Sequence, residues 1–535
     1  MLAPVPTLDA PRGMVAAPDH LAAQAGLQML RAGGSAVDAI VATSAVLAVT
    51  FQHACGMGGD LWAIVHPGEQ AGEGEEIVVL DSSGRAGSGA DLRRLLDEGH
   101  TAIPALGHPA AVPVPGCVDG WCTLHDRFGR LPLRDVLAPA RWYAESGFPA
   151  STTLASAVPR VLHLPEAADF AGPGALRPGQ TVRRPGVARA LDAIAGGGRD
   201  AFYLGEFGDG LLELGRGEYR PEDLERSQAS WVAPLSVEAF GARLWSAPPA
   251  SQGYLTLSSA WIADGLPLPE DPGDPAWAHL LVEAARQAGW DRPEVLWEGA
   301  EGAALLAEGR LGPRREAIRA DATWPLPGGW SAGGTIACVA VGPDRQGVTL
   351  MQSNASGFGS HLIVPGVRIF LHNRGLGFSL RPGHPAAYGP GRRPPHTLCP
   401  TLVTAPGGGL AAVLGTMGGD SQPQVLLQLL ARLLRSGQGP AEALAAGRWQ
   451  LTTAEPGPGA PAGFDTWGAE GSTRVVLEGQ VPPGWAGGLS SRGHAVEAAA
   501  AFSSSFGHAH AIVVGDGNLR GGTDPRTEGG GVAGW

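Results

Sequence analysis

The sequence predicts a mixed α+β protein in which strands buried on both faces lie between layers of helices. Helical periodicity dominates residues 18–50 and much of residues 88–330, whereas strand-like runs follow Gly334. Several of these runs are apolar throughout, as in "TIACVAV" at 335–341, which is typical of doubly covered strands. The 535 residues, 44% of them hydrophobic and 17% charged, are enough for a large core.

The elements before residue 100 alternate between helix and strand. Residues 18–34 have an amphipathic helical pattern that ends in a glycine pair, and Ser35 can cap the apolar helix that follows. The glycine loop "CGMGGD" at 55–60 leads into a strand at 61–67. A further strand and a polar turn follow at 77–87.

The middle of the chain is richer in helices, and the remainder is richer in strands. Clear helical patterns occupy 133–147 and 275–289, while 312–334 has many helix breakers and is expected to be an exposed or strained connector. The later elements are a helix opened by Pro423 and strands at 335–341, 347–354, 368–375, 398–405, 410–416 and 509–516.

Composition excludes several classes of function. The net charge is −13 without a basic block, which argues against a nucleic-acid partner or an anionic membrane surface. The chain has no lysine, so a Schiff-base lysine and a P-loop lysine are both impossible.

The cysteines and the N-terminus indicate a cytoplasmic protein. The five cysteines contain no CxxC pair and are expected to be free thiols in a reducing compartment. The first residues lack the pattern of a signal peptide, and the longest apolar stretch, 39–51, is too short to span a bilayer.

Thr335 is the residue on which the chemistry depends. A threonine before a strand can simply reflect the β-propensity of this residue type. If the bond between Gly334 and Thr335 is cut, however, Thr335 gains an α-amine that titrates near pH ~8 and can act as general base for its own hydroxyl. Gly334 permits the strained backbone that an attack on its carbonyl requires.

Motifs along nearly the whole chain carry a resemblance to a known family. They are, in order, "GMVAAPDHLAAQAGLQMLRAGGSAVDAIVA", "GMGGDLWAI", "VPGCVDGWCTLHDRFGRLPLRDVLAPARWYAESGF", "DAFYLGE", "PPASQGYLTL", "SNASGFGS", "RRPPHTLCPTLVT", "GTMGGDSQPQ" and "GGTDPRTEGG". In this joint order they resemble the γ-glutamyltransferase family of N-terminal-nucleophile hydrolases.

The resemblance implies an αββα four-layer sandwich made from one self-cleaved precursor. Residues 1–334 would form a large subunit and residues 335–535 a small subunit that begins at the nucleophile, Thr335. This residue would attack a γ-glutamyl amide, such as a glutathione-like small molecule, and pass the acyl group to water or an amino acid. Neither a metal nor an organic cofactor is implied.

The resemblance also assigns candidate binding residues. Gly418 and Gly419 match the glycines of the oxyanion hole, although glycines can also serve a tight turn here. Arg85 matches the arginine that holds the substrate α-carboxylate, a task that suits a guanidinium. A loop arginine can equally be solvated.

Four further positions match less uniformly. Thr397 occupies the place of the second of two serines that bind the α-carboxylate, and His396 replaces the first. Asn354 matches an asparagine of the site, and Ser353 is the nearest candidate for the hydroxyl that hydrogen-bonds the nucleophile.

Two departures from the family pattern concern the acyl group. Arg374 and Gly377 stand where the family has the residues that hold the α-amino group, and an arginine repels an ammonium. The region 378–393 is also shorter than in members with a lid loop, which leaves the site more open. Both departures favour the hydrolase and acylase-like branch of the family.

Three functions therefore follow from the sequence. The first is a γ-glutamyltransferase-family amidohydrolase biased towards hydrolysis, and the second is an acylase of the same fold that removes glutaryl or related groups. The third is an unprocessed binding protein without catalysis. The pair His508 and His510 is a weak candidate for a metal site, because the sequence shows no third ligand near it.

Overall fold

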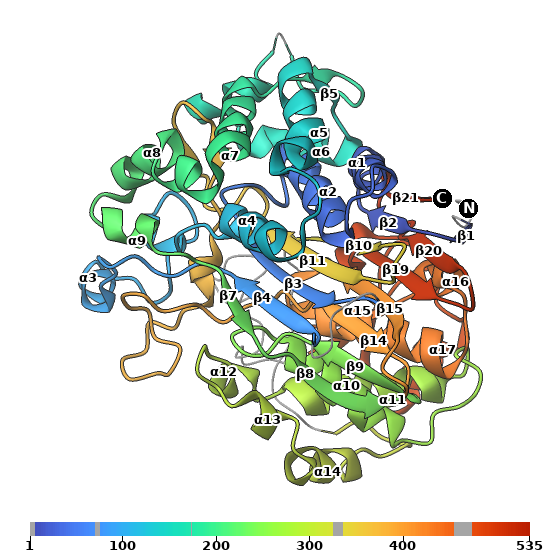
Figure 1. The fold of residues 1–535 in the computed structure, drawn as a ribbon. Coiled ribbons are helices and arrows are strands. Elements are labelled where there is room, and N and C mark those ends of the chain that lie inside the picture. The colour runs from blue at the N-terminus through green and yellow to red at the C-terminus, as the bar shows by residue number, and fades with distance from the viewer. Residues whose placement is uncertain (1–5, 70–74, 173, 325–334, 454–472) are drawn as a thin grey trace.

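The computed structural model describes residues 6–69, 75–172, 174–324, 335–453 and 473–535. Two seven-stranded antiparallel sheets lie face to face at the centre, and helices cover the outer face of each sheet (Figure 1). These four layers confirm the predicted αββα sandwich. The chain ends lie together, because Arg12 N–H donates to the carbonyl of Trp535 at 3.0 Å.

The first sheet combines strands from both ends of the sequence. Its order is β21 (Gly531–Gly534), β2 (Met14–Ala17), β10 (Ile336–Val341), β11 (Gly347–Ser353), β3 (Asp60–His66), β4 (Val78–Ser82) and β7 (Ser230–Val232). The second sheet has the order β1 (Leu8–Ala10), β20 (Leu519–Thr523), β19 (Ala509–Val514), β15 (Leu410–Thr416), β14 (Thr401–Thr404), β9 (Ala242–Ser246) and β8 (Leu235–Ala239). Segments before and after Thr335 therefore share both sheets.

The apolar strands are covered on both faces, by the other sheet on one face and by helices on the other. Side chains such as Trp62, Val339 and Val413 form the core between the two sheets. Over the first sheet lie α1 (His20–Arg31), α2 (Ala36–Thr50), α4 (Cys117–Phe128), α5 (Leu133–Ser146) and α7 (Pro185–Tyr203). Over the second sheet lie α10 (Gly253–Asp264), α11 (Pro275–Gly289) and α15 (Gln422–Leu430).

The sequence of helix α2 is apolar on every side because all of the residues of this helix are buried. Its start confirms the predicted cap: the Asp38 N–H donates to Ser35 Oγ at 3.0 Å, and the Ser35 N–H donates to Asp38 Oδ2 at 2.8 Å. All five cysteines are buried free thiols. Within the described parts of the chain, no helix is long and apolar enough to cross a bilayer.

Shorter elements join these layers. The helices are α3 (Leu92–Asp97), α6 (Thr152–Ala157), α8 (Glu206–Gly215), α9 (Pro221–Glu225), α12 (Arg292–Val295), α13 (Gly302–Leu305), α14 (Glu308–Glu316), α16 (Pro440–Ala445) and α17 (Gly484–Ser491). The minor strands are β5 (Phe148–Pro149), β6 (Thr181–Val182), β12 (Ile363–Val364), β13 (Ile369–Phe370), β16 (Trp449–Thr453), β17 (Thr473–Leu477) and β18 (Ala495–Ala498).

Two of the predicted boundaries are wrong. The connector at 312–334 begins as helix, because Arg310 and Arg314, one turn apart in α14, both pair with Asp291. The strand predicted at 368–375 is limited to β13, and a 3₁₀ turn, Arg374–Gly377, follows it. The last ten residues of the connector, 325–334, lie outside the described residues.

Candidate active site

Thr335 lies directly before β10, in the middle of the first sheet, and only 1% of its surface is exposed. The register pairs Ile336 with Gln352, which brings Thr335 level with Ser353 at the end of β11. Thr335 Oγ1 and Ser353 Oγ are 3.1 Å apart, and Ser353 Oγ also accepts the Ala355 N–H at 2.8 Å. Ser353 is therefore the hydroxyl that contacts Thr335. Gly334 lies outside the described residues.

Asn354 holds the loop next to this pair. Its Nδ2 donates to the carbonyl of Gln52 at 3.0 Å, and its backbone N–H donates to the carbonyl of Ala54 at 2.9 Å. A Cβ built on Gly56 would lie 3.5 Å from Asn354 Oδ1, so the loop passes close to the asparagine. Asn354 is fully buried and fixes the backbone that precedes β3.

Gly418 and Gly419 form the turn between β15 and α15. Their φ angles are 140° and 56°, which glycine adopts more readily than any other residue. Strands β10 and β15 pack face to face, since a Cβ on Gly415 would lie 3.0 Å from that of Ala337. This packing brings the glycine turn to the same edge of the sandwich as Thr335.

The glycine turn is fixed by neighbouring side chains. Gln252 Nε2 donates to the carbonyls of Gly419 at 3.0 Å and Thr397 at 2.9 Å. Ser421 Oγ donates to the carbonyl of Gly418 at 2.8 Å. With its carbonyls held in this way, the turn can present amide N–H groups at the start of α15.

Asp60 is a buried carboxylate that sequence reasoning missed. It begins β3 and pairs in register with Ser353, so both side chains lie on one face of the sheet. Asp60 Oδ2 accepts from Arg374 Nε at 2.6 Å and from His396 Nε2 at 3.0 Å. Arg374 Nη1 in turn donates to Thr397 Oγ1 at 3.0 Å. The predicted residues Arg374, His396 and Thr397 thus meet around Asp60, one strand away from Ser353.

The charges in this cluster, formed by Asp60, Arg374, His396 and Thr397, are fixed. Burial alone would raise the pKa of Asp60, but Arg374 and His396 hold it well below its usual range. Burial and the Arg374 guanidinium lower the pKa of His396 to about 4. His396 Nδ1 accepts the Leu398 N–H at 3.1 Å, as expected of a neutral ring protonated at Nε2. Near neutral pH the cluster is therefore an aspartate–arginine ion pair beside a neutral imidazole.

The position of Gly377 excludes the missing family carboxylate. A Cβ built there would lie 2.4 Å from the carbonyl of Pro395, so no side chain fits without movement of the backbone. In the region where the resemblance implies residues that hold the substrate α-amine, the site therefore has the guanidinium of Arg374. Residue 377 contributes no carboxylate there.

Arg85 pairs with groups outside this cluster. Its Nη1 donates to Glu298 Oε1 at 2.5 Å and to the carbonyl of Gly391 at 3.0 Å. The nearby Arg393 is buried and donates to Asp81 Oδ1 at 2.7 Å. The role that the resemblance gives to Arg85 stays a prediction, because the structure pairs its guanidinium with Glu298.

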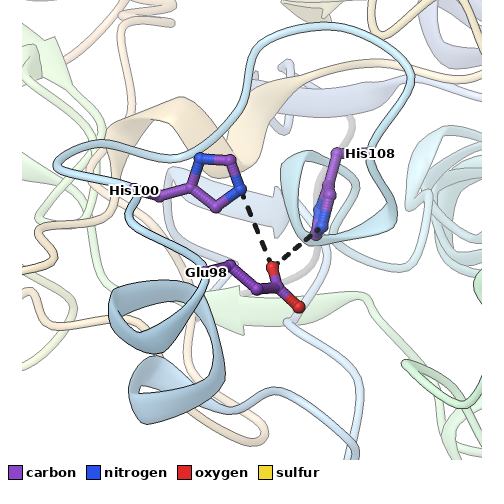
Figure 2. Close-up of side chains that lie close together, drawn as sticks. All are labelled: Glu98, His100 and His108. Carbon is purple, nitrogen blue, oxygen red and sulfur yellow. Dashed lines mark ion pairs between the residues drawn. The ribbon is translucent and has the colours of Figure 1, made fainter.

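A surface cluster of two histidines and a glutamate has the residue types of a metal site. Figure 2 shows Glu98 between His100 and His108, with Glu98 Oε2 3.7 Å and 3.8 Å from their Nε2 atoms. His108 Nδ1, however, accepts the Ala110 N–H at 3.1 Å. A neutral His108 therefore carries its proton on Nε2, which cannot then bind a metal. The three side chains form a surface group within ion-pair distance, not a preformed set of metal ligands.

A second group, His279, Glu283 and His494, is buried and joins α11 to the segment after α17. His279 Nε2 donates to the carbonyl of Arg319 at 2.7 Å, and its Nδ1 accepts from His494 at 2.8 Å. Glu283 Oε1 accepts from Arg286 at 2.6 Å and from Thr323 at 2.7 Å. These bonds use the lone pairs that a metal would need, and they anchor the connector upstream of residue 325.

His508 and His510 are buried and bind protein groups. His508 Nε2 lies 2.8 Å from Ser504 Oγ, and His510 Nδ1 lies 3.1 Å from Thr523 Oγ1. Asp524 is the neighbouring carboxylate, and its oxygens accept from Arg448 at 2.6 Å and Arg526 at 3.0 Å. Each histidine therefore makes one hydrogen bond within the fold, through one of its ring nitrogens.

Buried neutral imidazoles make stability sensitive to acid. Burial lowers the pKa of His510 to about 3 and that of His508 to about 4, from an ordinary value of 6.5. Below pH 6.5 the unfolded chain binds protons on these groups and the folded chain does not. The free energy of unfolding should therefore fall as the pH drops from about 6.5 to about 4, by up to about 1.4 kcal/mol per pH unit for each histidine.

The thermal midpoint, measured across this pH window, checks the expectation. His510→Gln should make the fall with decreasing pH shallower than in the wild type. His20→Gln is a matched control, because the side chain of His20 is 56% exposed, and it should keep the wild-type slope. Equal slopes for His510→Gln and the wild type would contradict the assignment.

Comparison with known proteins places the chain in a family. The sequence profile of the gamma-glutamyltranspeptidase family matches residues 22–534. The oxamate amidohydrolase proenzyme of Klebsiella pneumoniae subsp. pneumoniae is 36% identical over 538 residues, 97% of each chain. The glutathione hydrolase-like YwrD proenzyme of Bacillus subtilis is 34% identical over 97% of this chain and 98% of its own. The crystal structure of cephalosporin acylase from Bacillus halodurans is similar with a TM-score of 0.89 at 32% identity, over 100% of this chain and 98% of its own. The resemblance is thereby confirmed, and the chain belongs to the gamma-glutamyltranspeptidase family of hydrolases.

Proposed function

We propose that this protein cuts itself before Thr335 and then hydrolyses amides whose acyl group carries a carboxylate but no free α-amino group. The observation that carries the proposal is the buried guanidinium of Arg374. It contacts Thr397 Oγ1 at 3.0 Å and is held at 2.6 Å by Asp60, which pairs in register with Ser353, the partner of Thr335. Glutaryl-type amides have the required acyl group.

The first step would be activation of the precursor. The hydroxyl of Thr335 attacks the carbonyl carbon of Gly334, and the peptide C–N bond breaks as the acyl group moves to Oγ1, which frees the α-amine of Thr335. Water then hydrolyses the ester, which releases the carboxyl group of Gly334 and restores the hydroxyl of Thr335. The two products would be the segments 1–334 and 335–535. Because both segments contribute strands to each sheet, they would remain one folded body after the cut.

Catalysis by the mature enzyme would use the same hydroxyl. The neutral α-amine accepts the proton of Thr335 Oγ1 while this oxygen attacks the substrate carbonyl. The contact with Ser353 orients Oγ1, and the amides of Gly418 and Gly419 would stabilise the oxyanion. The amine product leaves with a proton from the α-ammonium, and water then hydrolyses the threonine ester to release the acid.

The acyl specificity follows from charge. A substrate carboxylate can accept from both the Arg374 guanidinium and the Thr397 hydroxyl, whereas the guanidinium offers an ammonium no acceptor. The name of one relative fits this choice, since oxamate carries a carboxylate and no α-amine. The geometry thus supports the acylase-type reaction over γ-glutamyl transfer. The unprocessed binding protein is less well supported, because Thr335 contacts a hydroxyl that suits a nucleophile.

Two chromogenic substrates test the proposal. We expect glutaryl-p-nitroanilide to be hydrolysed with a kcat/KM at least about tenfold above that of γ-glutamyl-p-nitroanilide, because only the latter brings an ammonium towards Arg374. The two compounds differ only at the α-carbon, so each is the control for the other. A preference for γ-glutamyl-p-nitroanilide would contradict the proposed acyl group.

A further inference from the structure

A loop of unusual backbone conformation connects the nucleophile region to the surface. It starts at Ser353 and Asn354 and runs past the segment at 51–54, where the Phe358 N–H donates to the carbonyl of His53 at 3.3 Å. The φ angles of Ala355, Phe358 and His361 are 69°, 58° and 61°, a region that residues other than glycine rarely adopt. Such strained conformations cluster at ligand sites.

Basic side chains gather along this loop. Arg160 lies against Gly357, since a Cβ built on that glycine would be 3.2 Å from Arg160 Nη1. The rings of His163 and His361 are 6.3 Å apart between centroids. We call Arg160, His163, His361 and His53 the basic rim. Arg160 and His163 are exposed, whereas His361 and His53 are partly buried.

The two partly buried rings of the basic rim have basic neighbours. Burial, His163 and Arg160 lower the pKa of His361, and burial, His508 and Arg160 lower the pKa of His53 to about 3. The neighbours that act on both rings are thus basic residues. An anion at this place would pair with the Arg160 guanidinium and accept hydrogen bonds from it and from the imidazole N–H groups.

The rim continues towards the glycine turn. His508, which acts on His53, follows Gly507, and a Cβ built on Gly418 would lie 3.9 Å from the Cα of Gly507. The residues that would hold the acyl group, Arg374 and Thr397, are at most 3% exposed. An amide with its acyl group against these residues would extend its amine portion past Thr335, and the loop that starts at Ser353, the partner of Thr335, leads from there to the rim.

From this arrangement we infer that the basic rim is a subsite for an anionic substituent, such as a carboxylate, on the amine portion of the substrate. The inference rests on the proposed function, because it takes the acyl group to lie against Arg374. Substrates would then be anionic at both ends, with one carboxylate on the acyl group and another beyond the scissile amide.

A pair of anilides that share the glutaryl group tests the inference. Glutaryl-p-nitroanilide and glutaryl-3-carboxy-4-nitroanilide differ by one carboxylate on the leaving aniline, and the readout is the ratio of their kcat/KM values. Arg160→Gln should lower the ratio in favour of the carboxylated anilide about fivefold, and Arg160→Glu about 20-fold. Arg160→Lys should retain most of the ratio, and added salt should reduce the effect of Arg160→Gln.

Arg177→Gln is the matched control, since Arg177 is an exposed arginine of the same region and should leave the ratio unchanged. An unchanged ratio in both Arg160→Gln and Arg160→Glu would overturn the inference. If only γ-glutamyl anilides were hydrolysed, the proposed acyl group would be wrong, and the corresponding γ-glutamyl pair would test the rim by itself. If neither series were hydrolysed, both proposals would fall.

Discussion

Thr335→Ala is expected to yield a single uncut chain of 54.7 kDa without measurable amidase activity. Alanine removes the only group that can attack the preceding carbonyl, and without the cut no α-amine forms to act as base. We expect activity to fall by at least about 10³-fold. Intact-mass analysis should show the wild type as two fragments of about 34 and about 20 kDa, in proportion to their lengths.

Thr335→Ser is the control for this loss. Serine keeps the hydroxyl that faces Ser353, so processing and part of the activity should remain. Wild-type activity in an uncut Thr335→Ala chain would exclude the N-terminal threonine mechanism. An uncut and inactive wild type would instead favour the non-catalytic binding protein.

Arg374→Gln should have the second largest effect. It removes the guanidinium that would bind the acyl carboxylate and leaves Asp60 buried without its cation. The first loss should lower kcat/KM for glutaryl-p-nitroanilide by about 10²–10³-fold, and the second should destabilise the fold by about 3–5 kcal/mol. Steady-state kinetics and thermal unfolding measure the two effects separately.

A double variant separates binding from folding. Arg374→Gln combined with Asp60→Asn removes both charges, so much of the lost stability should return, whereas the activity towards the glutaryl substrate should not. Recovery of wild-type kcat/KM in the double variant would show that Arg374 acts only as a structural partner of Asp60.

The contact between Thr335 and Ser353 agrees with the prediction from the sequence, and it joins neighbouring strands. Thr335, the strand that follows it and the hydroxyl of Ser353 lie in two consecutive segments joined by a short turn, and the structure pairs them directly. The cap of α2 is equally local, since Ser35 and Asp38 bond within one turn. Such contacts form between residues that are close to each other along the chain.

The cluster around Asp60 could not be predicted in the same way, because register and tertiary packing assemble it. Asp60 follows a glycine loop and gives no signal of its own, and only the pairing of β3 with β11 sets it beside Ser353. The sequence shows Arg374 as a charge that repels an ammonium, but its buried partner comes from 314 positions away. For Arg85, the residue type suits a contact with a substrate carboxylate, but it did not predict the contact with Glu298 that the structure shows.

The most direct test is the mass of the small subunit after a steady-state reaction with glutaryl-p-nitroanilide is quenched with acid. The account predicts one glutaryl group on the fragment that begins at Thr335, located by peptide mapping to that residue and absent from Thr335→Ala. Continued turnover without a labelled small subunit, or a glutaryl group on a different residue, would contradict it.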